Sequence, residues 1–254
     1  PDLRRRTNWA KVKFCQRNLL FCLFVLLPFV AERAAAQTAD LELVLAVDAS
    51  GSVDDSEFAL QLGGIAQGFR DPAVQDAVSR GAEGRIAVNL IAWAEHGMPK
   101  SETGWHQISD RSSAEQFAAT VERFSRDQNG ATGLGEGIAA AVRSINQNGL
   151  EAPRRVIDVS GDGRETPARE YVVLLPQARA MALAHGIVVN GLAISNAEED
   201  LAAYYRSDLQ AGPGSFVMEA RDYADFAAAM RRKLLREIEY RPDVTDAGAV
   251  PPRG

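Results

Sequence analysis

The chain has 254 residues with a formal net charge of −6 at pH 7, and its two cysteines are Cys15 and Cys22. It is long enough to form a domain with a sizeable core, and its acidity argues against nucleic acid or an anionic membrane surface as the main partner. Because no cysteine follows residue 22, a thiol nucleophile, a thiolate metal ligand and a disulfide are excluded from the rest of the chain.

The N-terminal segment, residues 1–36, is predicted to be a signal peptide. A basic stretch at 4–17 precedes the apolar run "NLLFCLFVLLPFV", and small residues at Ala34 and Ala36 form a signal peptidase site. We therefore expect cleavage after Ala36 and a periplasmic or secreted protein without cysteine. An uncleaved membrane anchor is the alternative, although the apolar run is short for a membrane span and contains a proline. Lipid attachment at Cys22 is disfavoured because the bulky Phe21 precedes it.

The remaining chain alternates between strand-like and helix-like segments. An apolar run predicts a strand at 41–47, and helical spacing predicts a helix from 58 to 69. Further along, we predict in order a strand at 85–93, a short strand at 104–108, helices at 112–124 and 134–145, and a strand at 154–160. These are followed by a helix that starts near Pro176, strands at 186–194 and 214–220, and a helix at 226–238.

This alternation predicts an α/β fold with a doubly wound, mostly parallel sheet and helices on both faces. We expect one domain at 37–240, because no linker divides the chain there. The tail at 241–254 is rich in proline and glycine and is predicted to be disordered.

Oxygen-bearing side chains gather at three predicted junctions between strands, loops and helices. Asp48, Ser50 and Ser52 follow the first strand, Thr132 precedes a helix, and Asp162 follows the strand at 154–160. In a doubly wound sheet, ligands bind beyond the carboxyl ends of the strands. Two carboxylates and three hydroxyls are oxygen donors of the kind that Mg²⁺ or Mn²⁺ prefers. The pattern therefore predicts a cation site.

Each element alone also has a simpler interpretation. Ser52 and Thr132 could be helix N-caps, and the acids at 54, 55 and 57 suit the first turn of a helix. The pair at 162–163 could form an ordinary Asp-Gly turn. Asp48 is harder to explain in this way, because a carboxylate at the end of a buried strand needs partners that offset its desolvation.

The combination of D-x-S-x-S, a later threonine in a glycine-rich turn and an Asp-Gly after a following strand resembles the von Willebrand factor type A (vWA) domain. The resemblance covers the chain from about Asp40 to Tyr240, and "RRVIDVSGDG", "VNGLAI" and "REIEY" further resemble an exported bacterial vWA-like family of unknown function. It implies a Rossmann-like sheet of six strands, of which 104–108 is antiparallel. It also implies a metal-ion-dependent adhesion site (MIDAS) that consists of Asp48, Ser50, Ser52, Thr132 and Asp162.

From this resemblance we expect a non-enzymatic protein-binding module, in which Mg²⁺ or Mn²⁺ binds an Asp or Glu carboxylate of a partner protein. One alternative is a metal-dependent hydrolase, but the chain has no G-x-S-x-G motif, and His96, His106 and His185 are its only candidate bases. A second alternative is a scaffold whose metal is only structural. A nucleotide site at "GLGEGI" is disfavoured because the G-x-G-x-x-G spacing is missing.

Overall fold

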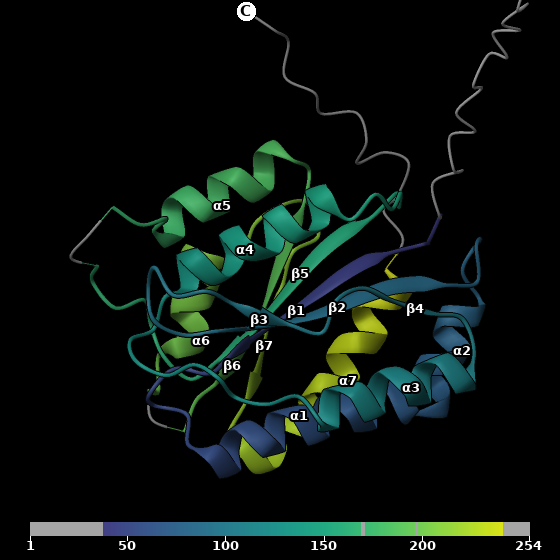
Figure 1. Ribbon diagram of the computed structural model, residues 1–254, viewed down its shortest axis with the longest axis horizontal. Coiled ribbons are helices and arrows are strands. Elements are labelled where there is room, and N and C mark those ends of the chain that lie inside the picture. Colours follow the sequence, from purple (N-terminus) through teal and green to yellow (C-terminus); the bar gives the residue numbers. More distant parts are fainter. Residues whose placement is uncertain (1–37, 169–170, 197, 241–254) are drawn as a thin grey trace, which may run out of the picture. The chain divides into compact units, whose positions relative to one another are not determined.

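The computed structural model describes residues 38–168, 171–196 and 198–240 (Figure 1). The predicted signal peptide at 1–36 and the predicted tail at 241–254 lie outside the described residues, so both stay predictions. Within the described ranges, no helix has the length and apolarity needed to cross a membrane.

The described residues form one sheet of seven strands in the order β3-β2-β1-β5-β6-β7, with β4 also paired to β2. Five strands run parallel to one another, namely β2, β1, β5, β6 and β7, whereas β3 and β4 pair with β2 in the antiparallel direction. The strands are β1 (Glu42–Asp48), β2 (Ile86–Trp93), β3 (Ser101–Glu102), β4 (His106–Ile108), β5 (Arg155–Gly161), β6 (Val188–Ile194) and β7 (Val217–Ala220).

Strand β1 is central, and all seven of its residues are buried. Because side chains alternate along a strand, β1 contributes to both faces of the sheet. Leu43, Leu45 and Val47 belong to one hydrophobic core, and Val44 and Ala46 belong to the other. This burial on both faces explains why the sequence of β1 is a continuous apolar run instead of an alternating one.

Helices cover both faces of the sheet (Figure 1). On one face lie α1 (Asp55–Arg70), α2 (Pro72–Ser79), α3 (Arg111–Glu122) and α7 (Tyr223–Glu239). On the other lie α4 (Leu134–Gln147), α5 (Leu175–Ala184), α6 (Leu201–Tyr204) and a π-helical turn, η1 (Tyr205–Leu209). The predicted fold class is therefore confirmed.

Some elements differ from the prediction for local reasons. The sheet has seven strands instead of six because β3 is only two residues long, too short to produce an apolar pattern. Helix α2 is separate from α1 because Asp71 caps it through the amide of Ala73, and Pro72 begins it. The segment α6–η1 was not predicted. The antiparallel strand near 104–108 and the helix start near Pro176 are confirmed.

A buried charged cluster joins α7 to β5 and β6. The Lys233 ammonium lies 2.7 Å from Asp158 Oδ1 and 2.6 Å from Glu237 Oε1, and all three side chains are inaccessible to solvent. Asn190 donates a hydrogen bond of 2.8 Å to the same Glu237 oxygen. Burial, together with the neighbouring Glu237, raises the pKa of Asp158 above its ordinary value. The cluster is therefore held by one lysine between two carboxyl groups, and loss of that lysine would leave them buried without a cation.

We expect Lys233→Met to lower the free energy of unfolding by about 3 kcal/mol or more, because it leaves buried acids uncompensated. Arg232→Met is the matched control, since Arg232 is the adjacent residue of α7 and is exposed. Its effect should stay within about 0.5 kcal/mol. Urea unfolding of both variants measures the difference, and equal losses would show that the cluster is not a major source of stability.

Candidate metal centre

The predicted site residues lie at the carboxyl edge of the sheet. β1 ends at Asp48, and its parallel neighbour β5 ends at Gly161, one residue before Asp162. Parallel neighbours end at the same edge, so the loops that carry the two aspartates meet there. The loop before α4 joins them, because the Gly51 amide donates a 2.7 Å hydrogen bond to the Gly130 carbonyl. The three loops predicted from the sequence therefore converge.

Four of the five predicted residues are joined by hydrogen bonds. Asp48 Oδ1 accepts from the amide of Ser50 at 2.7 Å. The hydroxyls of Ser50 and Ser52 lie 3.1 Å apart, and Ser52 Oγ donates to Asp162 Oδ1 at 2.6 Å. The chain of contacts thus runs from one aspartate to the other through the two serines.

Thr132 lies beside this group. A methyl group built on Gly163 would lie 3.5 Å from Thr132 Oγ1, which places the hydroxyl against the loop that follows Asp162. The Thr132 carbonyl accepts from the Thr166 amide at 2.9 Å. Among the described residues, no hydrogen bond joins the Thr132 hydroxyl to the other four side chains. The hydroxyl therefore keeps its acceptor positions for a ligand.

Asp48 is the most constrained member of the site. Its side chain is fully buried, and its Oδ2 has no hydrogen-bond partner among the described residues. Burial raises the pKa of Asp48 to about 7, and the nearby charge of Asp162 acts in the same direction. A buried carboxylate oxygen without a partner is costly, and a cation would offset that cost. The donor set therefore fits a divalent cation.

The predicted ligands of the site are all oxygen atoms, and this determines which ions the site would favour. Within the described ranges, no three His, Cys, Asp or Glu side chains gather as a metal site. Any cation at this edge would therefore depend on serine and threonine hydroxyls in addition to Asp48 and Asp162. Hydroxyl and carboxylate oxygens suit hard cations such as Mg²⁺ and Mn²⁺.

Three side chains that the sequence did not single out support the two aspartates. The Tyr223 hydroxyl donates to Asp162 Oδ2 at 3.0 Å, and Gln61 Nε2 donates to the Asp48 carbonyl at 3.1 Å. The hydroxyl of the buried Tyr205 and Asp48 Oδ2 both face Gly161. These residues come from α1, η1 and α7, far from the motif in sequence, so only the packing of those helices reveals them.

The helix-cap interpretations of Ser52 and Thr132 are wrong. Asp54 caps α1 because its carboxylate accepts from the Glu57 amide, and the Asp54 amide donates in turn to the Glu57 carboxylate. The N-cap of α4 is Gly133, which makes no side-chain capping bond. The hydroxyls of Ser52 and Thr132 are therefore not required to cap these helices.

The geometry offers no support for serine catalysis. His106 packs against Phe117, and His185 is the C-cap residue of α5. Nε2 of His96 lies 3.8 Å from Glu165 and has no hydrogen-bond partner. In the part of the chain that the structure describes, no hydrogen bond joins a histidine to Ser50 or Ser52, so neither hydroxyl is paired with a histidine base.

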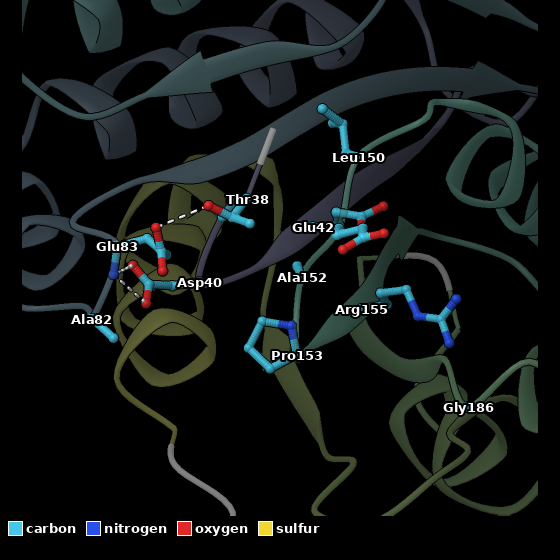
Figure 2. Close-up of a pocket in the computed structure, with 12 residues that line it drawn as sticks. Thr38, Asp40, Glu42, Ala82, Glu83, Leu150, Ala152, Pro153, Arg155 and Gly186 are labelled. Carbon is cyan, nitrogen blue, oxygen red and sulfur yellow. Dashed lines mark hydrogen bonds between the residues drawn. The ribbon is translucent and has the colours of Figure 1, made fainter. Parts of the chain in front are cut away.

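A cavity of about 550 Å³ lies at the opposite edge of the sheet, where β1 and β5 begin (Figure 2). Three of its four acidic residues have partners in the protein itself. Asp40 accepts from the amides of Glu83 and Arg85, Thr38 donates to Glu83, and Asn148 donates to Glu42. These contacts account for Asp40, Glu42 and Glu83 without a ligand, in contrast to Asp48 at the other edge.

Solved structures with the same fold include vWA domains of surface proteins. The pilus adhesin SpaC from Lactobacillus rhamnosus GG is 13% identical with a TM-score of 0.56, and the match covers 79% of this chain and 30% of SpaC. The vWF domain of the type V pili tip protein Mfa5 from Porphyromonas gingivalis is 12% identical with a TM-score of 0.52, over 83% of this chain and 100% of that domain.

A third similar structure is proximal thread matrix protein 1 from the mussel byssus, with a zinc-occupied MIDAS motif. It is 11% identical with a TM-score of 0.51, over 80% of this chain and 48% of the mussel protein. The chain thus spans about a third of the adhesin and about half of the matrix protein. At these identities, the likeness shows the fold alone.

No curated protein matches the chain. A family model does match, over residues 38–242, which is most of the sequence and includes all of the described residues. Its description is "Protein of unknown function (DUF1194)", and the structure shows that this family has a vWA-like fold. The chain therefore belongs to the DUF1194 family of vWA-like proteins.

Proposed function

We propose that this protein is an exported, metal-dependent protein-binding module. Asp48, Ser50, Ser52, Thr132 and Asp162 would hold Mg²⁺ or Mn²⁺, and the ion would bind an Asp or Glu carboxylate of a partner protein. The observation that carries the proposal is the buried Asp48 oxygen, which has no hydrogen-bond partner within the described ranges and lies next to two serine hydroxyls and a second aspartate. The protein would act by binding, without catalysis.

The chemistry of the donor set explains why a partner carboxylate would complete the site. Hydroxyl ligands carry no formal charge, so the positive charge of the ion is offset only by Asp48 and Asp162. An aspartate that binds through water offsets that charge less than one that binds directly. The ion would then attract an additional anionic ligand, and hard cations such as Mg²⁺ favour carboxylate oxygens.

The similar structures support a role in adhesion or interaction. Two of them are parts of pilus proteins, and a third is a matrix protein whose MIDAS motif is occupied by zinc. A partner in the cell envelope or outside the cell agrees with the predicted signal peptide. The alternative of a scaffold with a structural metal differs from this proposal in one measurable respect, because its partner would bind without the ion.

Mg²⁺ should stabilise the protein, because an ion that binds only the folded state adds about 2.7 kcal/mol at a concentration about 100 times its dissociation constant. In Asp48→Asn, this stabilisation should be lost. Without metal, the variant should unfold at the same or a higher temperature than the parent, because a buried charge has been removed. Asp55→Asn is the control, since the Asp55 side chain is 97% exposed. Thermal unfolding in Mg²⁺ and in EDTA measures both effects, and an unchanged Mg²⁺ response in Asp48→Asn would contradict the proposed ligand set.

Two glycine-to-alanine variants test whether the open space beside Asp48 is needed for stability and for the Mg²⁺ response. A methyl group at Gly161 would lie 2.7 Å from Asp48 Oδ2 and 2.9 Å from the Tyr205 hydroxyl, whereas one at Gly163 meets only Thr132, at 3.5 Å or more. We expect Gly161→Ala to cost about 1–3 kcal/mol of stability and to weaken the Mg²⁺ response. Gly163→Ala should retain both properties. Identical behaviour of the two variants in thermal unfolding would show that the space beside Asp48 is not needed.

Binding itself is tested by capture of partners from an envelope extract. The parent protein should retain a partner in Mg²⁺ and release it in EDTA, and a short peptide that contains aspartate should compete with it. Asp48→Asn should capture nothing in either buffer, and Asp55→Asn should behave as the parent. Capture that persists in EDTA and in Asp48→Asn would instead support the scaffold alternative.

A further inference from the structure

A second cavity, of about 480 Å³, lies beside the candidate metal centre. It is lined by Glu95, His96, Ala131, Thr166, Pro167, Ala168 and Val172. These residues come from the loop after β2, the loop before α4 and the loop after β5. The last two loops also carry Thr132 and Asp162. We call this space the Glu95 cavity.

Thr132 links the Glu95 cavity to the metal centre. Its amide donates to Thr166 Oγ1 at 3.2 Å, and its carbonyl accepts from the Thr166 amide at 2.9 Å. These two bonds hold the cavity wall at Thr166 next to the Thr132 hydroxyl. A partner segment bound at the metal centre could therefore place a neighbouring side chain in the cavity.

One residue of the cavity wall has a buried polar atom without a hydrogen-bond partner among the described residues. The His96 side chain is only 8% exposed, and its Nε2 is buried without a hydrogen bond. The nearest acid, Glu165, is 3.8 Å away, beyond hydrogen-bond distance, and its two oxygens already accept from the amides of Gly135 and Leu175. Buried polar groups in folded proteins normally have a partner, so this atom is an unsatisfied group within the wall of the cavity.

Carboxylates set the charge of the cavity. Glu95 Oε2 accepts from the Ala131 amide at 2.9 Å, and a carboxylate has several further acceptor positions. Gly130 allows this arrangement, because its φ of 106° is unfavourable for other residues and a side chain there would overlap the Glu95 carboxylate. Lys100 donates to the backbone carbonyl of Glu95 at 2.7 Å and interacts electrostatically with Glu95 and Glu136, but it does not line the cavity, where Glu95 is the one acidic residue among the described lining residues. With Glu165 nearby, the cavity favours a cationic group.

We propose that the Glu95 cavity binds a lysine or arginine side chain that lies close in sequence to the metal-binding carboxylate of the partner. This inference rests on the proposed function, and it names the partner's chemistry more narrowly. The carboxylate would bind the ion beside Thr132, and the basic side chain would bind Glu95 on the other side of Thr132. Partners with an aspartate but no basic neighbour would bind more weakly.

An array of short peptides tests the inference. Each peptide contains one aspartate, and the residues around it are varied between lysine, alanine and glutamate. The protein is applied in Mg²⁺ and in EDTA. We expect Mg²⁺-dependent binding that is about tenfold or more tighter with lysine than with alanine at one or more positions, the range of a charge-assisted hydrogen bond. Glu95→Gln should remove this lysine preference and retain the Mg²⁺-dependent binding. Asp55→Asn, with an exposed acid on the α1 side of the same edge, should keep both.

Two results would overturn the inference, and they differ in what they say about the metal centre. Mg²⁺-dependent binding without a lysine preference, or with a preference that survives in Glu95→Gln, would refute the role of the cavity and leave the proposed function intact. An array without any Mg²⁺-dependent binding would refute the proposed function and this inference together. Thermal unfolding of Glu95→Gln in Mg²⁺ shows that the variant is folded and still responds to the ion.

Discussion

The burial of the Asp48 carboxylate is the constraint on which the carboxyl edge of this protein depends. β1 is buried on both faces, so the residue that ends it has no access to water. One carboxylate oxygen accepts from the Ser50 amide, and the other has no hydrogen-bond partner among the described residues. An isolated buried charge is costly, and the proposed cation would offset that cost.

The same constraint explains why residues distant in sequence surround the site. Tyr223 binds Asp162, Gln61 binds the Asp48 carbonyl, and Tyr205 faces the space next to Asp48. Each comes from a helix or turn that packs against the sheet. They orient the aspartates without adding charge, as neighbours of metal ligands commonly do. The geometry of the candidate metal centre is therefore a product of the packed fold as well as of its motif.

Polar groups continue along β5 beneath helix α7. At the carboxyl end, Tyr223 of α7 contacts Asp162, and within the strand, Lys233 of α7 contacts Asp158. Between them, Ser160 donates to Gln61 of α1 at 3.3 Å. This face of the sheet thus combines an apolar core with specific polar contacts that define how α1 and α7 sit on β5. The Glu95 cavity belongs to the other side of the site, where the loops from β2 and α4 meet.

The sequence alone determined the fold class and the motif. Apolar runs that alternate with helical spacing predicted the parallel sheet, and the position of Asp48, Ser50, Ser52 and Asp162 after strands predicted that they would meet. Hydrophobic periodicity can be read from neighbouring residues in the sequence. Once the strands are known to be parallel, the general rule that their carboxyl ends share one edge brings the residues that follow them together.

The tertiary structure decided what local patterns cannot encode. It showed that Asp54 and Gly133, not Ser52 and Thr132, are the helix N-caps, because capping depends on which backbone amides face the side chain. It added β3, whose two residues pair with β2. It also placed Tyr223, Tyr205 and the Glu95 cavity at the site. Contacts between residues far apart in sequence arise from packing, so only the folded chain could reveal them.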